Sequence, residues 1–251
     1  MLRLLVVTAH PDDEAANFGG TLLHYAARGV QTAVLCLTAG QAATHRGTAT
    51  SDEELASIRR EEFQLACRIL RVHHAEVLDY RDGQLPRVDF YAAVADLTRR
   101  IRLIRPHVVL TYGPEGGVTA HTDHGMASLI TTAASQWSAR NNIFRDIPNI
   151  GAPWQAEKLY YATALFTLKG RPPISQSPPT ACINVQEHFD LKIKAFKQHA
   201  TQAPLFPMFE EHVAKREHQE MFHLAATATP HKIQWETDLF DGIEDAEGTS
   251  D

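Results

Sequence analysis

The chain has 251 residues, of which 44% are hydrophobic and 22% are charged, and its formal net charge is −6. This size and composition are typical of one soluble globular domain. The acidic balance argues against nucleic acid or an anionic membrane surface as a partner. No apolar run approaches the roughly 18 residues of a membrane span. Three widely separated cysteines without a CxxC pair favour a reducing, cytoplasmic setting.

Apolar runs typical of buried strands alternate with segments whose apolar residues recur at helical spacing. Gly29 closes the first helical segment and Ser51 opens the second, as expected for C-terminal and N-terminal caps. In chain order, the pattern predicts a strand over residues 2–8, a helix over 15–28, a strand over 30–37, a loop over 38–50, a helix over 51–70, a strand over 75–79, a helix over 91–104, a strand over 108–112 and a helix over 121–139.

This alternation predicts an α/β fold: a single domain with a Rossmann-like, mostly parallel sheet and helices on both faces. Its core is expected within about residues 1–140, and residues 141–237 are expected to elaborate the substrate pocket. Residues 238–251 are acidic with few apolar side chains, which predicts a disordered tail. Within the elaboration we expect an irregular connection over 141–154, a strand over 158–163, a Pro-rich loop over 170–180 and helices over 189–201 and 210–225.

Two polar motifs directly follow predicted strands. AHPDDE occupies residues 9–14 after the first strand, and HTDH occupies residues 121–124 after the fourth. In a Rossmann-type order 3-2-1-4-5, strands one and four are neighbours where the strand order reverses, and ligands bind beyond the carboxyl ends of the strands at that point. The two motifs are therefore expected to lie side by side.

The residue types in the two motifs predict a metal centre. Imidazole and carboxylate groups bind Zn²⁺, and catalytic zinc sites keep one position open for water. Asp12 is the candidate general base, because adjacent Asp side chains in an irregular turn point in different directions. His121 is expected to donate to the developing oxyanion as an imidazolium, oriented by Asp123. The assigned metal ligands are His10, Asp13 and His124.

These residues have three other interpretations. The acidic turn could be a solvated helix start, because carboxylates are favoured there. A nucleotide-binding Rossmann-like module with Mg²⁺ is a second alternative, although the first strand leads into HPDDE and not into a Gly-rich phosphate turn. A metal-binding protein without turnover is a third, and the presence of Asp12 and His121 argues against it.

The AHPDDE and HTDH motifs resemble those of the LmbE-like (PIG-L) metal-dependent de-N-acetylases. The resemblance covers about residues 1–202 and includes RREEF at residues 59–63, Asp82-Gly83 and KAFKQHATQ at residues 194–202. It implies one zinc ion, or another divalent ion, on the ligands named above, with Asp12 as base and His121 as electrophilic assistant.

Substrate contacts are expected from three further residues in the resembling segments. Each has a simpler interpretation: Arg59 and Glu62 as a surface ion pair, Asp82 as a turn residue, and His199 as a partly buried structural histidine. The candidate substrate-binding residues are Arg59, Asp82 and His199.

The resemblance implies a hydrolase that releases acetate and a free amine from an N-acetylglucosamine-type conjugate. A bacillithiol-pathway-like or other small conjugate is the expected substrate, and an amidase of thiol conjugates is the alternative. Thr119 stands where members of the mycothiol pathway carry a tyrosine, which argues against that subgroup. Family members often assemble into trimers or hexamers, so a homo-oligomer is an implied partner.

Overall fold

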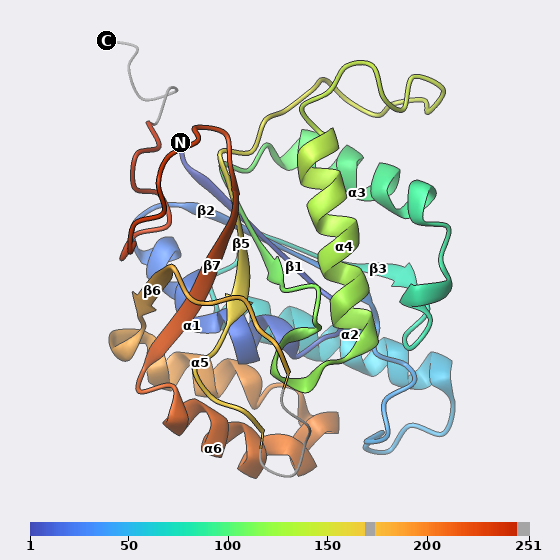
Figure 1. Cartoon of the computed structure of the whole chain (residues 1–251). Coiled ribbons are helices and arrows are strands. Elements are labelled where there is room, and N and C mark those ends of the chain that lie inside the picture. Colours follow the sequence, from blue (N-terminus) through green and yellow to red (C-terminus); the bar gives the residue numbers. More distant parts are fainter. Residues whose placement is uncertain (169–173, 245–251) are drawn as a thin grey trace.

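The computed structural model describes residues 1–168 and 174–244, and within them seven strands form one sheet in the order β3-β2-β1-β4-β5-β7-β6 (Figure 1). The first five strands are mutually parallel, whereas β7 runs antiparallel to both of its neighbours. The predicted order 3-2-1-4-5 and the single α/β domain are confirmed. The strands are β1 (Arg3–Thr8), β2 (Gln31–Thr38), β3 (His74–Tyr80), β4 (Val108–Tyr112), β5 (Lys158–Thr163), β6 (Ala181–Asn184) and β7 (Gln219–Thr227).

Helices cover both faces of the sheet (Figure 1). One face packs against α1 (Asp13–Ala27), α2 (Asp52–Ile69), α5 (Phe189–Phe196) and α6 (Phe206–Lys215), and the other against α3 (Phe90–Ile104) and α4 (Thr122–Trp137). Short 3-10 helices are η1 (Leu85–Arg87), η2 (Gly117–Thr119), η3 (Gln186–His188) and η4 (Ala200–Leu205).

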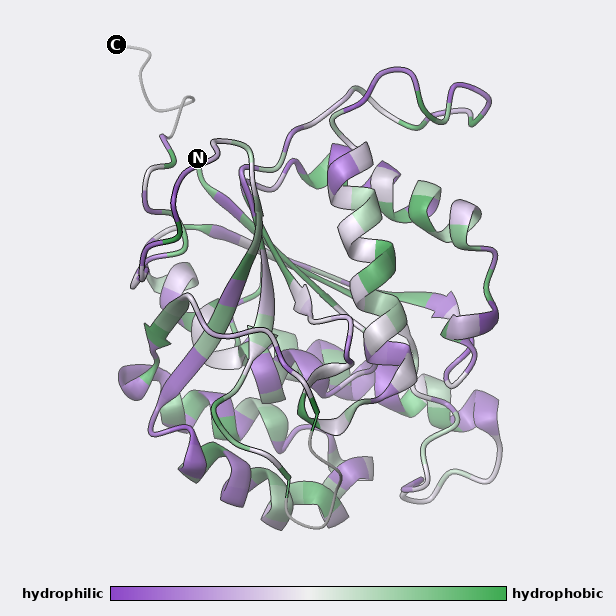
Figure 2. Ribbon diagram, in the orientation of Figure 1, coloured by the Kyte–Doolittle hydropathy of each residue, from purple (hydrophilic) through white to green (hydrophobic). Residues whose placement is uncertain are grey.

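Strand β1 shows why the apolar runs are continuous. Leu4 and Val6 belong to the core on the α1 side, while Leu5 and Val7 belong to the core on the α3 side. A strand buried on both faces has no polar face to alternate with the apolar one. The strands are accordingly hydrophobic at the centre of the molecule, with polar helix faces outside (Figure 2).

The structure confirms the predicted helix caps at Ser51 and Gly29. The Ser51 hydroxyl accepts a hydrogen bond from the backbone N–H of Glu54 at 3.1 Å, which satisfies one free donor at the start of α2. Gly29 follows α1 with φ of +79°, a left-handed conformation that costs glycine little.

The region after residue 141 differs most from the expectation. The predicted helix over 210–225 is wrong: α6 ends at Lys215, and the chain continues into β7. The predicted helix over 189–201 ends at Phe196 and gives way to η4, and β6 was not predicted. Because β5, β6 and β7 complete the same sheet, the core is not confined to residues 1–140. The predicted loop over 170–180 lies partly outside the described residues.

The predicted disordered tail is also wrong for its first residues. Leu239 is fully buried, and its backbone N–H donates to the Tyr25 hydroxyl at 2.7 Å. Asp238 accepts hydrogen bonds from Tyr25 and Arg28. A few apolar side chains therefore anchor this segment against α1, despite its acidic composition. Residues 245–251 lie outside the described range. Among the described helices, none combines the length and apolarity needed to cross a bilayer.

Candidate metal centre and catalytic site

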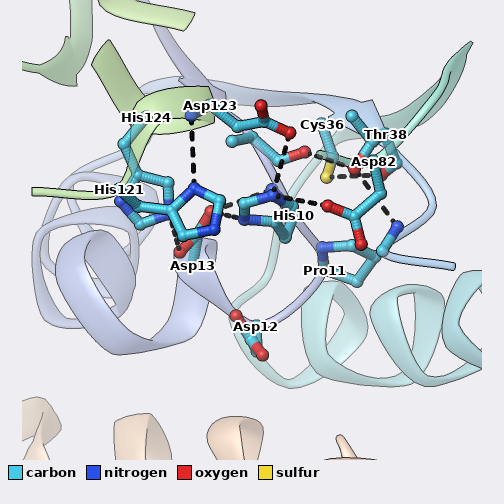
Figure 3. Close-up of polar contacts among 12 residues, drawn as sticks. His10, Pro11, Asp12, Asp13, Cys36, Thr38, Asp82, His121, Asp123 and His124 are labelled. Atoms are coloured by element: carbon cyan, nitrogen blue, oxygen red, sulfur yellow. Dashed lines mark hydrogen bonds and ion pairs between the residues drawn. The ribbon is translucent and has the colours of Figure 1, made fainter. Parts of the chain in front are cut away.

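The loops after β1 and β4 meet at the carboxyl end of the sheet. The two strands pair in parallel, with Leu4 opposite Val108 and Val6 opposite Leu110, so their C-terminal loops emerge side by side. The His10 ring centroid lies 4.9 Å from that of His121 and 5.2 Å from that of His124 (Figure 3). The expected meeting of the two motifs is therefore observed.

Asp13 lies between two of these imidazoles. Its Oδ2 is 3.5 Å from His10 Nδ1, and its Oδ1 is 3.3 Å from His124 Nε2. Two ligands of one tetrahedral zinc ion, each about 2.0 Å from the metal, lie roughly 3.3 Å apart. Nitrogen atoms of His10, His121 and His124 also all lie within 4.8 Å of one another. The donor set and its spacing thus fit a divalent metal of the zinc type.

The outer nitrogen of His10 faces two carboxylates. Its Nε2 is 3.0 Å from Asp82 Oδ1 and 3.5 Å from Asp123 Oδ2. Backbone N–H groups hold both carboxylates, that of Ala42 for Asp82 and that of Gly83 for Asp123. Burial opposes a charge on His10, but hydrogen bonds to its carboxylate neighbours raise its pKa well above the usual value. This arrangement leaves Nδ1 facing Asp13 and the metal position.

Asp123 was expected to orient His121, and the structure corrects this. The Asp123 carboxylate contacts His10 and Gly83, and only its backbone N–H reaches His121, donating to Nδ1 at 3.2 Å. His121 is the N-cap of α4, so its ring turns back onto the first helical turn. Because Nδ1 accepts this hydrogen bond, the neutral ring carries its proton on Nε2.

The predicted imidazolium form of His121 is not favoured. Burial lowers the pKa of His121, and the neighbouring imidazoles of His10 and His124 lower it further. A neutral His121 can still donate through Nε2–H, so the expected hydrogen-bonding role needs no charge on the ring. His121 is also the most exposed of the three imidazoles.

Asp12 has a different environment from its neighbour. Its carboxylate points away from the imidazole cluster, whereas that of Asp13 points into it (Figure 3). Its backbone φ is +110°, a strained value for a residue with a side chain, and its N–H donates to Glu14 Oε2 at 2.9 Å. Burial raises the pKa of Asp12 to about 6, although the Arg59 guanidinium opposes the shift.

Arg59 holds the turn that carries Asp12. It is 3% exposed and donates to Asp12 Oδ2 at 2.9 Å, to the Gly40 carbonyl at 2.9 Å and to the Pro11 carbonyl. Glu62 does not pair with it at the surface. Glu62 is buried and accepts hydrogen bonds from the backbone N–H and hydroxyl of Thr201, both at 2.7 Å. The surface-pair interpretation is therefore wrong.

His199 lies beneath the turn. Its ring is fully buried, and Nε2 is 2.7 Å from Glu14 Oε1. Glu14 therefore connects His199 with the backbone of Asp12. The three candidate substrate contacts, Arg59, Asp82 and His199, are all buried. They contact Asp12, His10 and Glu14, respectively. None of the three candidates is among the described residues that line the adjacent pocket.

That pocket has a volume of about 150 Å³ and opens beside the cluster. Its polar lining includes Asp12, Asp13 and His124, and Met208, Phe209 and Val213 of α6 contribute apolar side chains. This places both aspartates on one cavity, although they face different neighbours. The pocket is lined by Asp12, Asp13, Ala16, Asn17, Val118, Thr119, His124, Phe196, Leu205, Met208, Phe209, His212, Val213 and Arg216.

Tyr112 supports the site and was not identified from the sequence. Its ring stacks on His124 with centroids 4.1 Å apart and planes 6° apart, and its hydroxyl contacts Asp13 and accepts from Asn17. The available signal was its place as the last residue of β4, directly before the Gly-rich loop.

The fold and the site together define an α/β protein with a His/Asp cluster suited to a metal at the carboxyl ends of β1 and β4. The chain belongs to the PIG-L family: the family model described as GlcNAc-PI de-N-acetylase matches residues 5–135. The sequence-based assignment to this family, and to N-deacetylases as an enzyme class, is confirmed.

Curated relatives support this assignment along most of the chain. Proteins named 1D-myo-inositol 2-acetamido-2-deoxy-alpha-D-glucopyranoside deacetylase are similar to it. The one from Rhodococcus erythropolis is 32% identical, over 82% of each chain. The one from Mycobacteroides abscessus is 31% identical, over 96% of this chain and 98% of its own. Among solved structures, the conserved protein TT1542 from Thermus thermophilus has a TM-score of 0.73 at 26% identity, over 92% of this chain and 98% of that chain.

The nucleotide-binding alternative is not supported. Its phosphate would bind at the N-terminus of α1, where backbone N–H groups point at the ligand. In this chain Asp13 and Glu14 occupy that first turn with buried carboxylates, which would repel a phosphate. Family membership agrees with this electrostatic argument.

Proposed function

We propose that the protein is a zinc-dependent hydrolase that removes the acetyl group from a small N-acetylglucosamine conjugate, releasing acetate and a free amine. Family membership and the deacetylase relatives support the reaction class. The observation that carries the metal assignment is the spacing of Asp13 between His10 and His124, at 3.5 and 3.3 Å.

In this proposal three side chains hold the ion: His10 through Nδ1, Asp13, and His124 through Nε2. The chemistry that a bound zinc ion supplies is polarisation of a carbonyl group and a lowered pKa of water. Asp82 and Asp123 orient the His10 ring electrostatically, with carboxylate oxygens 3.0 and 3.5 Å from Nε2, a common arrangement behind a metal-binding histidine. Tyr112 keeps the His124 ring in place by stacking.

Asp12 acts as the general base. Its carboxylate lines the pocket and accepts the proton of the attacking water, then passes that proton to the departing amine. His121 is exposed and lies next to the pocket-lining His124, with ring centroids 5.1 Å apart, and from there it donates its Nε2–H to the oxygen of the acetyl group as negative charge develops. Arg59 and the Glu14–His199 pair are positioning residues, because they hold the Asp12 turn without lining the pocket.

An assay of amine release with metal analysis tests this function. The purified enzyme should contain close to one divalent ion per chain and should release a primary amine from a small N-acetylglucosamine glycoside. Asp12→Asn should retain the metal and lower kcat by at least about 100-fold, the usual share of a general base. Amine release that persists without a bound divalent ion, or a protein that binds no added zinc although its histidines are intact, would contradict the proposal. Assembly into trimers or hexamers and a cytoplasmic location stay predictions.

A further inference from the structure

Three adjoining pockets lead from the metal cluster toward the C-terminal end of β5 and the start of β7. The pocket beside the cluster shares Asn17, Val118, Thr119, His124 and Arg216 with a second, smaller pocket. That pocket in turn shares Thr163 and Arg216 with an outer pocket of about 290 Å³. Arg216 lines all three cavities. A conjugate whose acetyl group reaches the metal would therefore extend its other half past this side chain.

The Arg216 guanidinium has few partners in the protein. It follows α6 directly, and its Nη2 donates to Asn17 Oδ1 at 3.0 Å, while its Nε is buried without a hydrogen-bond acceptor. Among the described residues, no carboxylate forms an ion pair with it. Glu220, the carboxylate that acts on it electrostatically, instead binds Lys192 and two backbone N–H groups of α1.

The surroundings of Arg216 keep its charge available to a ligand. Phe166 covers one side, with the guanidinium carbon 5.9 Å from its ring centroid. Lys215 adds a second positive charge to the outer pocket, although it pairs with Glu211 at the surface. Glu217 is the one carboxylate among the described lining residues of that pocket, and no ion pair joins it to Arg216. A partly buried guanidinium without a carboxylate is costly unless a ligand supplies the anion.

We propose that Arg216 binds an anionic group, a carboxylate or a phosphate, on the part of the conjugate that is attached to the N-acetylglucosamine unit. This inference rests on the proposed deacetylase function. A guanidinium presents paired N–H donors that match the two oxygens of such a group. Asn17 holds the guanidinium at the junction of the three pockets and is itself fixed by the Tyr112 hydroxyl.

Kinetics on matched substrates test the inference. Two N-acetylglucosamine glycosides would be compared, one carrying a carboxylate on its aglycone and one carrying the corresponding primary amide. The wild-type enzyme should prefer the carboxylate by about 10- to 100-fold in kcat/KM, the contribution of a hydrogen bond to a charged group. The preference should lie mainly in KM, because the contact is remote from the reacting carbonyl. A phosphate-bearing glycoside then distinguishes the two anions.

Variants identify the residue responsible. Arg216→Gln should abolish the preference while changing turnover of the amide less than about threefold, and Arg216→Lys should retain only part of it, since one ammonium cannot make a paired contact. Lys197→Gln removes the same charge at an exposed position outside the three pockets and should leave the preference within about twofold. Thermal melts confirm that each variant is folded.

The outcomes separate the two proposals. If the wild-type enzyme releases amine from both glycosides at equal rates, or if Arg216→Gln slows both equally, the anion site is overturned while the deacetylase function stands. If the wild-type enzyme with bound metal releases amine from neither glycoside nor from simpler N-acetylglucosamine derivatives, the proposed function itself fails, and the anion site fails with it.

Discussion

At the scale of single residues, Asp12 and Asp13 show how two adjacent carboxylates take different roles. Asp13 starts α1 and faces two imidazoles, whereas Asp12 is turned toward the pocket by a φ of +110°. Such a conformation costs about 1–3 kcal/mol and persists only where the surroundings enforce it. Glu14 and Arg59 supply that enforcement through hydrogen bonds to the turn.

Arg59→Lys should therefore lower activity without removing the metal. One ammonium cannot reach Asp12, Pro11 and Gly40 together, so the base would lose its fixed position. We expect kcat to fall by about 100-fold, the usual cost of a 1 Å displacement in an active site. Metal content per chain, measured on the same preparation, should be unchanged.

Arg60→Lys is the matched control. Arg60 lies on the same helix but donates to carbonyls of β3 and to Asp79, away from the site. It should leave kcat within about twofold of the wild type. Equal losses of activity in both variants would show that α2 packing, and not the Asp12 turn, is what Arg59 provides.

The sequence predicted that the two motifs would meet, but it did not predict most of the contacts that hold them in place. His10, Asp13 and His124 could be placed because residue chemistry and strand order point to the same edge. The contact of Asp82 with His10 could not be predicted, because it depends on how the loop after β3 folds over the β1 turn. The Glu14–His199 contact joins residues 185 positions apart, so no local sequence pattern predicts it.

At the scale of elements, β7 is a strand that begins within the segment that the apolar spacing predicted to be a helix. Its buried residues alternate, with Glu220, Phe222 and Leu224 facing inward. The charged Glu220 at a buried position conceals the alternation of apolar and polar residues, because a glutamate there is also typical of the polar face of a helix. Its burial is explained by partners from other elements: the Lys192 ammonium on α5 and the N–H groups of Gly20 and Thr21 on α1.

The Glu220 contacts should make folding stability depend on acid pH. Burial opposes ionisation, but Lys192 and the α1 N–H groups hold the pKa of Glu220 below its usual value. Its stabilising contribution is therefore fully present above about pH 4.5 and is lost as the pH falls through the lower folded-state pKa. Glu220→Gln should cost about 3–5 kcal/mol at pH 7, because it leaves Lys192 charged and buried.

Urea unfolding at several pH values tests this dependence. The difference in unfolding free energy between wild type and Glu220→Gln should shrink as the pH falls below about 4.5, since the wild-type carboxyl becomes neutral too. Glu211→Gln, which disrupts an exposed helix pair with Lys215, should change stability little at any pH. A difference that stays constant between neutral and strongly acidic pH would contradict the assignment.

At the scale of the whole molecule, the parallel sheet explains why distant segments converge. The carboxyl ends of β1, β2, β3 and β4 lie along one edge, and their loops supply the metal cluster and the residues behind it. His199, from the segment between α5 and α6, then contacts Glu14 directly after the β1 turn. Strand order could be predicted because connections between parallel strands have a fixed hand. The antiparallel β6–β7 edge could not, because β6 has only four residues and the buried Glu220 conceals the alternation in β7.

A metal that joins the β1 and β4 loops should stabilise the entire domain. An ion that binds only the folded state at 100 times its Kd contributes about 2.7 kcal/mol, which corresponds to roughly 5–10 °C in Tm for a chain of this length. Chelation should lower the Tm of the wild type by that amount, and added zinc should restore it. This readout does not depend on activity.

Single histidine variants then separate ligands from other site residues. His124→Ala should abolish the zinc-dependent rise in Tm, because it removes a ligand from the β4 side of the cluster. His121→Ala should keep most of the rise, because Nδ1 of His121 already accepts from the Asp123 backbone and its Nε2 carries a proton. His231→Ala, at an exposed position, controls for the loss of an imidazole. If His121→Ala abolishes the rise as completely as His124→Ala, then His121 is a ligand, and a different group must assist the acetyl oxygen.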